Sequence, residues 1–205
     1  GPCDPAAMDE RLARYRARRD PDRTPEPAGR GPGRTPGGRR FVLQKHDAST
    51  LHYDFRLEIE GVLVSWAVPK GPRPDPRVKR LAVRTEDHPL AYADFEGVIP
   101  QDEYGGGAVL LWDQGTYRNL RARKGRRSRS MERSLQEGLL EVELHGEKLT
   151  GGWALKRFRR GAQEQWLLIK MRDDAADARR NPVSTQPRSV ASGRTLAAVA
   201  REDTP

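Results

Sequence analysis

The chain has 205 residues, which is the length of one domain or of one domain with tails. Its 38 Lys and Arg against 29 Asp and Glu give a formal net charge of +9. That charge favours a polyanionic partner, nucleic acid or an anionic membrane, although a charged surface that only maintains solubility explains it equally well. One cysteine excludes an internal disulfide and argues against a cysteine-based metal site.

The first part of the chain, residues 1–40, is rich in Arg, Pro and Gly and predicts a flexible basic N-terminal segment. Within it, residues 8–18 are compatible with a short helix that places Leu12 and Tyr15 on one face. Residues 30–40 have almost no apolar side chain and are typical of a linker.

From residue 41 onward the composition changes to short apolar or alternating runs separated by Gly and Pro. This spacing predicts a mainly β domain over residues 41–173, either a sandwich or a barrel, with few short helices. The runs are residues 41–45, 51–59, 62–68, 79–84, 108–112, 139–144, 153–158 and 165–171.

Three connecting segments carry further signals. Glu60 and Gly61 lie between two strand-like runs and predict a tight hairpin turn. Residues 121–130 form an arginine-rich loop, which is either a disordered insertion or an electrostatic contact for phosphates. Residues 174–205 are rich in Ala, Arg, Asp, Ser and Pro, and we expect a disordered tail or an interdomain linker there.

The run over residues 51–59 has two chemically distinct faces. Side chains alternate along a strand, so Tyr53 and its period-two neighbours form an apolar face. The opposite face receives His52, Asp54 and Arg56, followed by Glu58. Neighbours on one face lie roughly 6.5 Å apart at Cα, so His52 and Asp54 can share one ion.

His46 lies one short connection upstream and is a candidate for a third ligand. Two imidazoles and a carboxylate suit Mn, Fe, Co or Zn better than Ca and leave positions open for water and substrate. A divalent ion there acidifies water and polarises a phosphoryl oxygen. The alternative is that these histidines are ordinary surface or core residues, which is the usual reading of an isolated histidine.

A second polar cluster follows the run over residues 79–84. Glu86, His88 and Tyr92 lie close together in sequence, and Pro89 fixes the chain between them. His88 and Tyr92, together with an arginine, are suitable for gripping a phosphate, and His88 could protonate a leaving oxygen. The same stretch is equally compatible with a polar turn. His145, in contrast, is expected at a surface turn.

The motif QKHxAxxLHYDFRLE over residues 44–58 resembles the 3′-phosphoesterase module of bacterial DNA ligase D. The resemblance covers residues 10–173 in order and without large gaps, and its first motif is long and specific. The other matching segments are residues 12–27, 65–72, 86–100, 104–117, 151–158 and 166–170.

The resemblance implies a compact closed β-barrel with a substrate groove. It implies a manganese-dependent hydrolase, with Co²⁺ or Zn²⁺ as alternative ions, that acts on the 3′ ends of DNA primer–templates in nonhomologous end joining. Such an enzyme removes a 3′-terminal ribonucleoside and then the remaining 3′-phosphate, which leaves a 3′-OH. It further implies a monomer in the bacterial cytoplasm, associated with the nucleoid, and ligase and polymerase modules or Ku as partners.

The resemblance also implies roles for individual residues. The residues that match its metal ligands are His46, His52 and Asp54. Those that match the residues around the scissile phosphate are Arg56, His88 and Tyr92, with Gln44 and Glu86 at supporting positions. The basic positions near the substrate are Lys70 and Arg80, and the leading segment contributes Arg19, Asp20 and Glu26.

The chain departs from the family pattern at Pro21, at Asp102 and in residues 121–130, none of which removes a site residue. Two other function classes remain as alternatives. One is a non-catalytic module that binds nucleic-acid ends and has a structural metal site, but such sites are more often closed by a fourth ligand. The other, an anionic-membrane-binding protein, lacks a basic amphipathic helix of adequate length.

Overall fold

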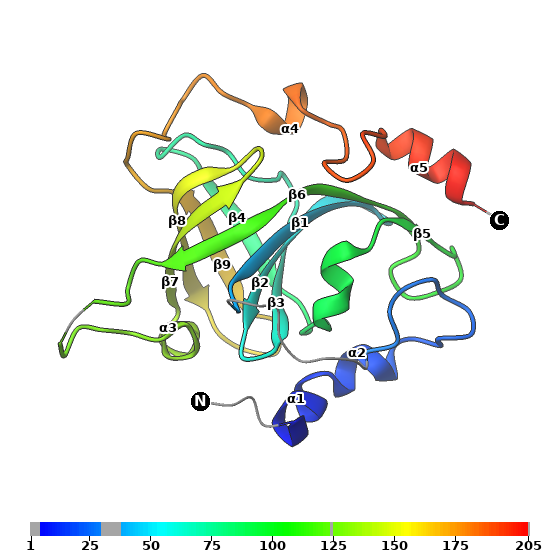
Figure 1. The fold of residues 1–205 in the computed structure, drawn as a ribbon, viewed down its shortest axis with the longest axis horizontal. Helices are drawn as coiled ribbons and strands as arrows, with labels where there is room; N and C mark the ends of the chain where they lie inside the picture. Colours follow the sequence, from blue (N-terminus) through cyan, green and yellow to red (C-terminus); the bar gives the residue numbers. More distant parts are fainter. Residues whose placement is uncertain (1–4, 30–37, 124, 205) are drawn as a thin grey trace.

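The computed structural model describes residues 5–29, 38–123 and 125–204, and its centre is a strongly curved antiparallel sheet (Figure 1). The strand runs expected from the sequence are present, and four of the eight are longer than predicted. The strands are β1 (Arg40–Asp47), β2 (Leu51–Ile59), β3 (Val62–Val68), β4 (Lys79–Arg84), β5 (Gly97–Ile99), β6 (Gly107–Asn119), β7 (Leu139–Gly146), β8 (Thr150–Arg159) and β9 (Gln165–Lys170).

The sheet closes on itself. Its strand order is β1-β2-β3-β4-β9-β8-β7-β6-β5, and an additional antiparallel pairing joins β1 to β6. The closure leaves β5 as a short outer strand that pairs only with the start of β6. The predicted mainly β fold with a closed barrel is therefore confirmed.

The hairpin between β2 and β3 fixes the register of the strand that carries most of the candidate site. Ile59 pairs with Val62, and the two residues between them have positive φ, 49° at Glu60 and 83° at Gly61. This is the two-residue turn whose twist suits a hairpin, as the sequence predicts. With that register, Asp54 lies opposite Ala67.

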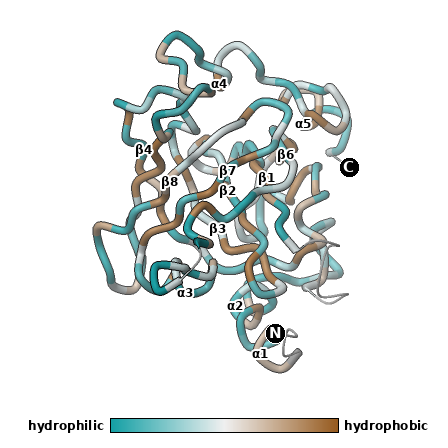
Figure 2. Tube along the Cα trace, turned by 60° about the vertical axis from the view of Figure 1, so that its left-hand side comes forward, coloured by the Kyte–Doolittle hydropathy of each residue, from teal (hydrophilic) through white to brown (hydrophobic). Residues whose placement is uncertain are grey.

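Both faces of β2 are buried, although the sequence suggests a half-buried strand. Tyr53, Phe55, Leu57 and Ile59 belong to the apolar cluster inside the barrel, as expected. Figure 2 shows the hydrophobic stretches, in brown, that run along the barrel strands. On the other face of β2, Arg56 is only 3% exposed.

The cover over that outer face is a second apolar cluster, formed by strand residues together with residues of the N-terminal segment and of a 3₁₀ helix. It joins Val42 of β1 and Leu63 of β3 to Tyr15 and to Tyr92 of the 3₁₀ helix η1 (Leu90–Asp94). The polar side chains on β2 are therefore enclosed between the barrel wall and the covering segments, and so must be paired or hydrogen-bonded.

The N-terminal segment supplies part of this cover. The predicted helix is present as two short helices, α1 (Pro5–Arg11) and α2 (Ala13–Ala17), which lie across the barrel wall (Figure 1). Leu12 is 3% exposed and Tyr15 is fully buried, so the predicted shared face is the packing face. Residues 5–29 thus differ from the expected flexible segment, whereas residues 30–37 of the expected linker lie outside the described residues.

The basic loop over residues 121–130 precedes a helix that the sequence did not predict, α3 (Met131–Glu137). The side chain of Ser130 caps its first turn by accepting a hydrogen bond from the Arg133 backbone N–H. At the other end of α3, Glu137 forms ion pairs with Arg121 and Arg129, which tie the loop to the helix. In the described parts of the chain, no helix has the length and apolar character needed to cross a bilayer.

The C-terminal segment is more ordered than the disordered tail that was one of the two expectations for residues 174–205, and the other, an interdomain linker, stays a prediction. It contains α4 (Pro182–Thr185) and α5 (Leu196–Asp203), and Val199 of α5 is fully buried. The Val190 N–H donates to the Leu111 carbonyl at 2.9 Å, and Lys148 Nζ donates to the Gln186 carbonyl at 2.9 Å. A few apolar anchors and backbone hydrogen bonds therefore order a segment whose composition is mainly polar.

We expect Val199→Asp to lower the free energy of unfolding by about 3 kcal/mol, because it buries an unpaired charge under α5. Arg201→Asp, at an exposed position of the same helix, is the control and should change stability little. Urea denaturation followed by circular dichroism measures both variants. Equal stabilities for the two variants would contradict the packing of α5 on the barrel.

Candidate metal centre and phosphate site

The three candidate metal ligands converge on the outer side of the barrel. His46 on β1 pairs directly with His52 on β2, and Asp54 follows on the same face of β2. The Asp54 Oδ2 atom lies 3.1 Å from His52 Nε2 and 3.6 Å from His46 Nδ1. One ligand atom from each residue lies within 4.8 Å of the others, so the group can hold one ion.

Backbone carbonyls orient both imidazoles. His46 Nε2 lies 2.6 Å from the Gly105 carbonyl oxygen, and His52 Nδ1 lies 3.0 Å from the Thr50 carbonyl oxygen. A carbonyl only accepts, so these two ring nitrogens carry protons, and the other nitrogen of each ring faces Asp54, where without its proton it would offer a lone pair to a metal ion. Histidine ligands are typically held in this way, and the donor set therefore fits a transition-metal ion.

Asp54 is ionised although it is buried. Burial alone would raise the pKa of its carboxyl, but the charge of Arg56 and hydrogen bonds with His46 and His52 hold the pKa well below its usual range. Burial would also lower the pKa of His52, yet its hydrogen bond and its attraction to Asp54 outweigh burial and raise that pKa. The site therefore contains a permanent negative charge beside the two imidazoles.

Arg56 lies next to the metal group and is held rigidly. Its Nε donates to Gln44 Oε1 at 2.7 Å, while Nη2 lies 3.5 Å from Asp54 Oδ2. Gln44 is itself fixed, because its Nε2 donates to the Tyr92 carbonyl at 2.8 Å. The guanidinium carbon lies 4.8 Å from the centre of the Tyr92 ring, and Nη1 lies 3.2 Å from His88 Nδ1. Gln44 thus aims both Nη groups at the space between Asp54 and His88.

His88 is neutral in this arrangement. Burial lowers the pKa of its imidazole well below the usual value, and the charges of Arg56 and Arg19 lower it further. Its Nδ1 also lies 2.9 Å from the Glu86 carbonyl oxygen. Without a bound phosphate, Arg56 therefore provides the positive charge beside this ring.

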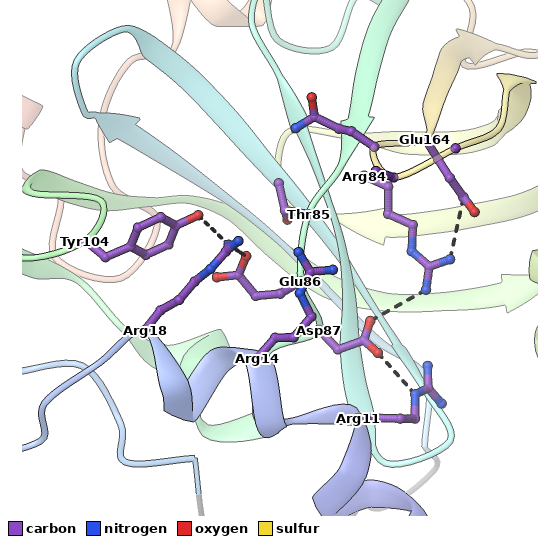
Figure 3. A pocket seen from close by; sticks show the side chains of 12 residues that line it. Arg11, Arg14, Arg18, Arg84, Thr85, Glu86, Asp87, Tyr104 and Glu164 are labelled. Carbon is purple, nitrogen blue, oxygen red and sulfur yellow. Dashed lines mark hydrogen bonds and ion pairs between the residues drawn. The ribbon is translucent and has the colours of Figure 1, made fainter.

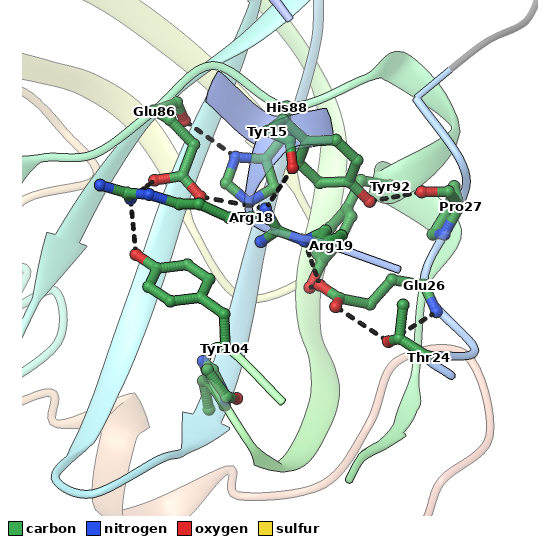
Figure 4. A network of polar contacts seen from close by, with 12 residues as sticks. Tyr15, Arg18, Arg19, Thr24, Glu26, Pro27, Glu86, His88, Tyr92 and Tyr104 are labelled. Carbon is green, nitrogen blue, oxygen red and sulfur yellow. Dashed lines mark hydrogen bonds and ion pairs between the residues drawn. The ribbon is translucent and has the colours of Figure 1, made fainter. Parts of the chain in front are cut away.

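Tyr92 points away from the metal group. Its hydroxyl donates to Glu26 Oε2 at 2.6 Å, and the same carboxylate accepts from Arg19 Nε at 3.1 Å and from Thr24 Oγ1 at 3.0 Å (Figure 4). Burial and then Glu26 raise the pKa of Tyr92 well above its usual value. Tyr92 therefore serves here to connect η1 to the N-terminal segment through a neutral hydroxyl.

Glu86 connects the second polar cluster to α2 and the residues that follow it. Its Oε1 accepts from Arg19 Nη1 at 3.2 Å, and its Oε2 accepts from Arg18 Nη1 at 2.7 Å (Figure 4). Arg18 also donates to the Tyr104 hydroxyl at 2.8 Å, and the Arg19 guanidinium stacks 3.9 Å from the centre of the Tyr15 ring. These contacts hold the N-terminal segment against Glu86 and Tyr104.

Not all the residues expected from the resemblance are in this network. Asp20 Oδ1 accepts from the Asp22 backbone N–H at 3.0 Å and so stabilises a local turn. Arg80 Nε donates to the Gly71 carbonyl at 3.2 Å, and Lys70 is exposed. Among the described residues, no hydrogen bond or ion pair connects Lys70 or Arg80 to the metal group.

Several residues of the polar network around Glu86 and Glu26 were not predicted from the sequence. Tyr15 was expected only as a packing residue, and Arg18, Thr24 and Tyr104 were not singled out. Tyr104 stands directly before the glycine run, and Gly105 of that run supplies the carbonyl that orients His46. A tyrosine beside a run of glycines was the one signal that could have identified it.

Comparison with known proteins gives a consistent picture. The family model described as the DNA Ligase D 3'-phosphoesterase domain matches residues 44–157. The chain is 52% identical over 190 residues to the multifunctional non-homologous end joining protein LigD of Pseudomonas aeruginosa, covering 90% of this chain and 22% of that protein. It is 44% identical over 168 residues to the corresponding DNA repair protein LigD of Mycobacterium tuberculosis, covering 82% and 21%. The chain thus spans about a fifth of the length of these relatives.

Proposed function

This chain belongs to the DNA ligase D 3′-phosphoesterase domain family, and from that premise we propose that it is a metal-dependent enzyme that trims the 3′ ends of DNA primer–templates. It removes 3′-terminal ribonucleosides as a phosphodiesterase and 3′-phosphates as a phosphomonoesterase, which leaves a 3′-OH. The observation that carries the proposal is the placement of Arg56 and His88 beside a group of possible metal ligands.

His46, His52 and Asp54 would hold the divalent ion. Manganese is the ion that we propose, while cobalt and zinc suit the same mixture of nitrogen and oxygen donors. A divalent ion supplies Lewis acidity to a phosphoryl oxygen and lowers the pKa of an attacking water. The chain's own contribution is to orient the two imidazoles through the Gly105 and Thr50 carbonyls before the substrate arrives.

Arg56 would bind the non-bridging oxygens of the phosphate. Its two Nη groups lie between Asp54 and His88, and Gln44 holds its Nε, so the guanidinium cannot turn away. A fork of charge-assisted donors in a buried site stabilises the negative charge that grows on the phosphoryl oxygens in the transition state.

His88 would donate a proton to the leaving O3′. Its Nδ1 donates to the Glu86 carbonyl at 2.9 Å, so a second proton on the ring is held at Nε2, from which it can be given to the substrate oxygen. A phosphate that arrives beside the ring adds negative charge and so raises the depressed pKa of His88 towards the range of a useful acid.

The biological setting follows from the relatives, which are named as proteins of non-homologous end joining. We propose the same pathway for this chain, with ligase and polymerase modules or Ku as partners and the bacterial nucleoid as its location. A non-catalytic end-binding module with a structural metal is less well supported, because it gives no role to a buried arginine held between Asp54 and His88.

The test is hydrolysis of a primer–template whose primer ends in a 3′-phosphate. With Mn²⁺ we expect release of inorganic phosphate, no release in EDTA, and recovery when Mn²⁺ is added in excess, because the reaction requires the ion. A primer with one 3′-terminal ribonucleoside tests the phosphodiesterase step by gel mobility. Absence of both reactions with Mn²⁺, Co²⁺ and Zn²⁺ would reject the proposal.

A further inference from the structure

A cavity of about 440 Å³ lies beside Glu86 and Tyr104 (Figure 3). It lies where the N-terminal helices meet the end of β4 and the turn between β8 and β9. We call it the arginine pocket, defined by Arg11, Arg14, Arg18, Arg84 and Thr85. None of the five residues that define the pocket takes part in the proposed chemistry at the metal centre.

The carboxylates in the pocket do not neutralise its arginines. Asp87 is shared between Arg11, at 3.1 Å, and Arg84, at 3.8 Å (Figure 3). Glu164 is likewise shared between Arg84, at 3.6 Å, and Arg157, at 3.7 Å. One negative charge between two guanidiniums leaves a local excess of positive charge.

The same sharing occurs at Glu86, which pairs with Arg18 and with Arg19, as described above. The side chain of Arg14 is exposed, and no hydrogen bond or ion pair among the described residues involves it. Four arginines line the pocket together with three carboxylates, which gives a formal surplus of one positive charge.

The Thr85 hydroxyl is an independent indication that the pocket takes a polar ligand. Its Oγ1 is buried and has no hydrogen-bond partner among the described residues, although the residue lines the pocket. A buried hydroxyl without a partner is uncommon and calls for a water, an ion or a ligand. Asp87 Oδ1 in the same pocket also has no hydrogen bond, but Arg84 Nη2 lies 3.8 Å from it and balances its charge. The Thr85 hydroxyl and the unused guanidinium N–H groups can donate, so the pocket suits an anion that offers several acceptors.

We propose that the arginine pocket binds a backbone phosphodiester of the DNA substrate, beside the phosphate that reacts at the metal centre. This inference rests on the proposed function, because it assumes that the substrate is a DNA strand that extends away from the 3′ end. Arg14 would contribute its free guanidinium, Thr85 its hydroxyl, and Arg18 would connect the pocket to the site through Glu86. Arginine forks bind phosphate oxygens in pairs, which also fixes the register of the strand.

The test measures DNA binding without hydrolysis. A fluorescently labelled primer–template with an ordinary 3′-OH is titrated with protein in EDTA at several salt concentrations, and anisotropy gives Kd. We expect Arg14→Glu to weaken binding about tenfold and to reduce the slope of log Kd against log salt by about one, because one phosphate contact is lost. Arg14→Lys should restore most of the affinity. Arg179→Glu, at an exposed arginine outside the pocket, is the matched control.

A second variant tests the hydroxyl without changing charge. Thr85→Val should weaken binding about threefold with an unchanged salt slope, because a neutral donor is lost. Competition by inorganic phosphate alone, at concentrations too low to screen the control, would identify free phosphate rather than a strand as the ligand and overturn the proposal. So would an Arg14→Glu affinity equal to that of Arg179→Glu.

Failure of this inference can be told apart from failure of the proposed function. If Arg14→Glu binds DNA like the control while the wild type releases phosphate with Mn²⁺, the pocket is wrong and the enzyme assignment stands. If binding depends on Arg14 but neither substrate is hydrolysed with any of the ions, the pocket stands and the enzyme assignment fails.

Discussion

Asp54→Asn is expected to lower the rate of phosphate release by about three orders of magnitude, because it removes the anionic ligand of the proposed ion. The amide has nearly the same size as the carboxylate, so packing against β1 and Arg56 is preserved. The substitution also leaves Arg56 without its neighbouring negative charge, at 3.5 Å. The effect should appear in the affinity for Mn²⁺ and in kcat together.

Calorimetric titration with Mn²⁺ separates this role from a structural one. We expect one Mn²⁺ per wild-type chain and strongly weakened binding in Asp54→Asn, with a melting temperature in EDTA close to that of the wild type. Asp177→Asn, at a partly exposed aspartate away from the site, should bind and hydrolyse normally. A fully active Asp54→Asn would show that the ligand assignment is wrong.

Arg56→Lys is expected to lower kcat about a hundredfold with a smaller change in KM, because lysine keeps the charge but loses the fork. A single ammonium cannot reach Gln44, Asp54 and His88 at once, as the guanidinium does. Gln44 Oε1 would also be left buried without its partner. The loss of binding energy should therefore be greater for the transition state than for the bound substrate, because the charge on the phosphoryl oxygens is greatest in the transition state.

Steady-state kinetics on the 3′-phosphate primer–template measure this split. Arg118→Lys, at an exposed arginine paired with Glu143, is the matched control and should leave both constants unchanged. A rate for Arg56→Lys within threefold of the wild type would mean that the guanidinium fork does not bind the reacting phosphate.

The strands were predictable because side-chain alternation and turn residues can be recognised within a short stretch of sequence. Alternation along residues 51–59 identified the inward face of β2, and Glu60-Gly61 identified the turn that sets its register. The burial of Asp54 and Arg56 was not predictable, because the cover comes from α2 and η1, tens of residues away in either direction. Polar residues on one face of a strand predict that this face is exposed to solvent, unless segments from elsewhere in the fold cover it.

In the two terminal segments, amino-acid composition predicts flexibility although the structure is ordered. Residues 5–29 and 182–203 contain few large apolar residues, and flexibility was expected for both. Tyr15 and Val199 are nevertheless fully buried, and Glu26 is held by Arg19 and Tyr92. A small number of well-placed anchors orders each segment, and their positions depend on the barrel surface rather than on their own sequence.

The chemistry was predictable only in part. The identity of the metal group follows from residue type and strand period, whereas Arg19 and Glu26 came only from the resemblance. The neutrality of His88 depends on its burial and on Arg56 and Arg19, which approach it from β2 and the N-terminal segment. Charge states of this kind are properties of the assembled site.

We propose that His46, His52 and Asp54 share one ion next to Arg56. The decisive experiment is a crystal structure of the protein with Mn²⁺ and a phosphate mimic, with anomalous diffraction data collected at the manganese edge. We expect one anomalous peak between His46 Nδ1, His52 Nε2 and the Asp54 carboxylate, with the anion against the Arg56 guanidinium. A peak elsewhere, or a centre closed by further protein ligands with the anion away from Arg56, would contradict it.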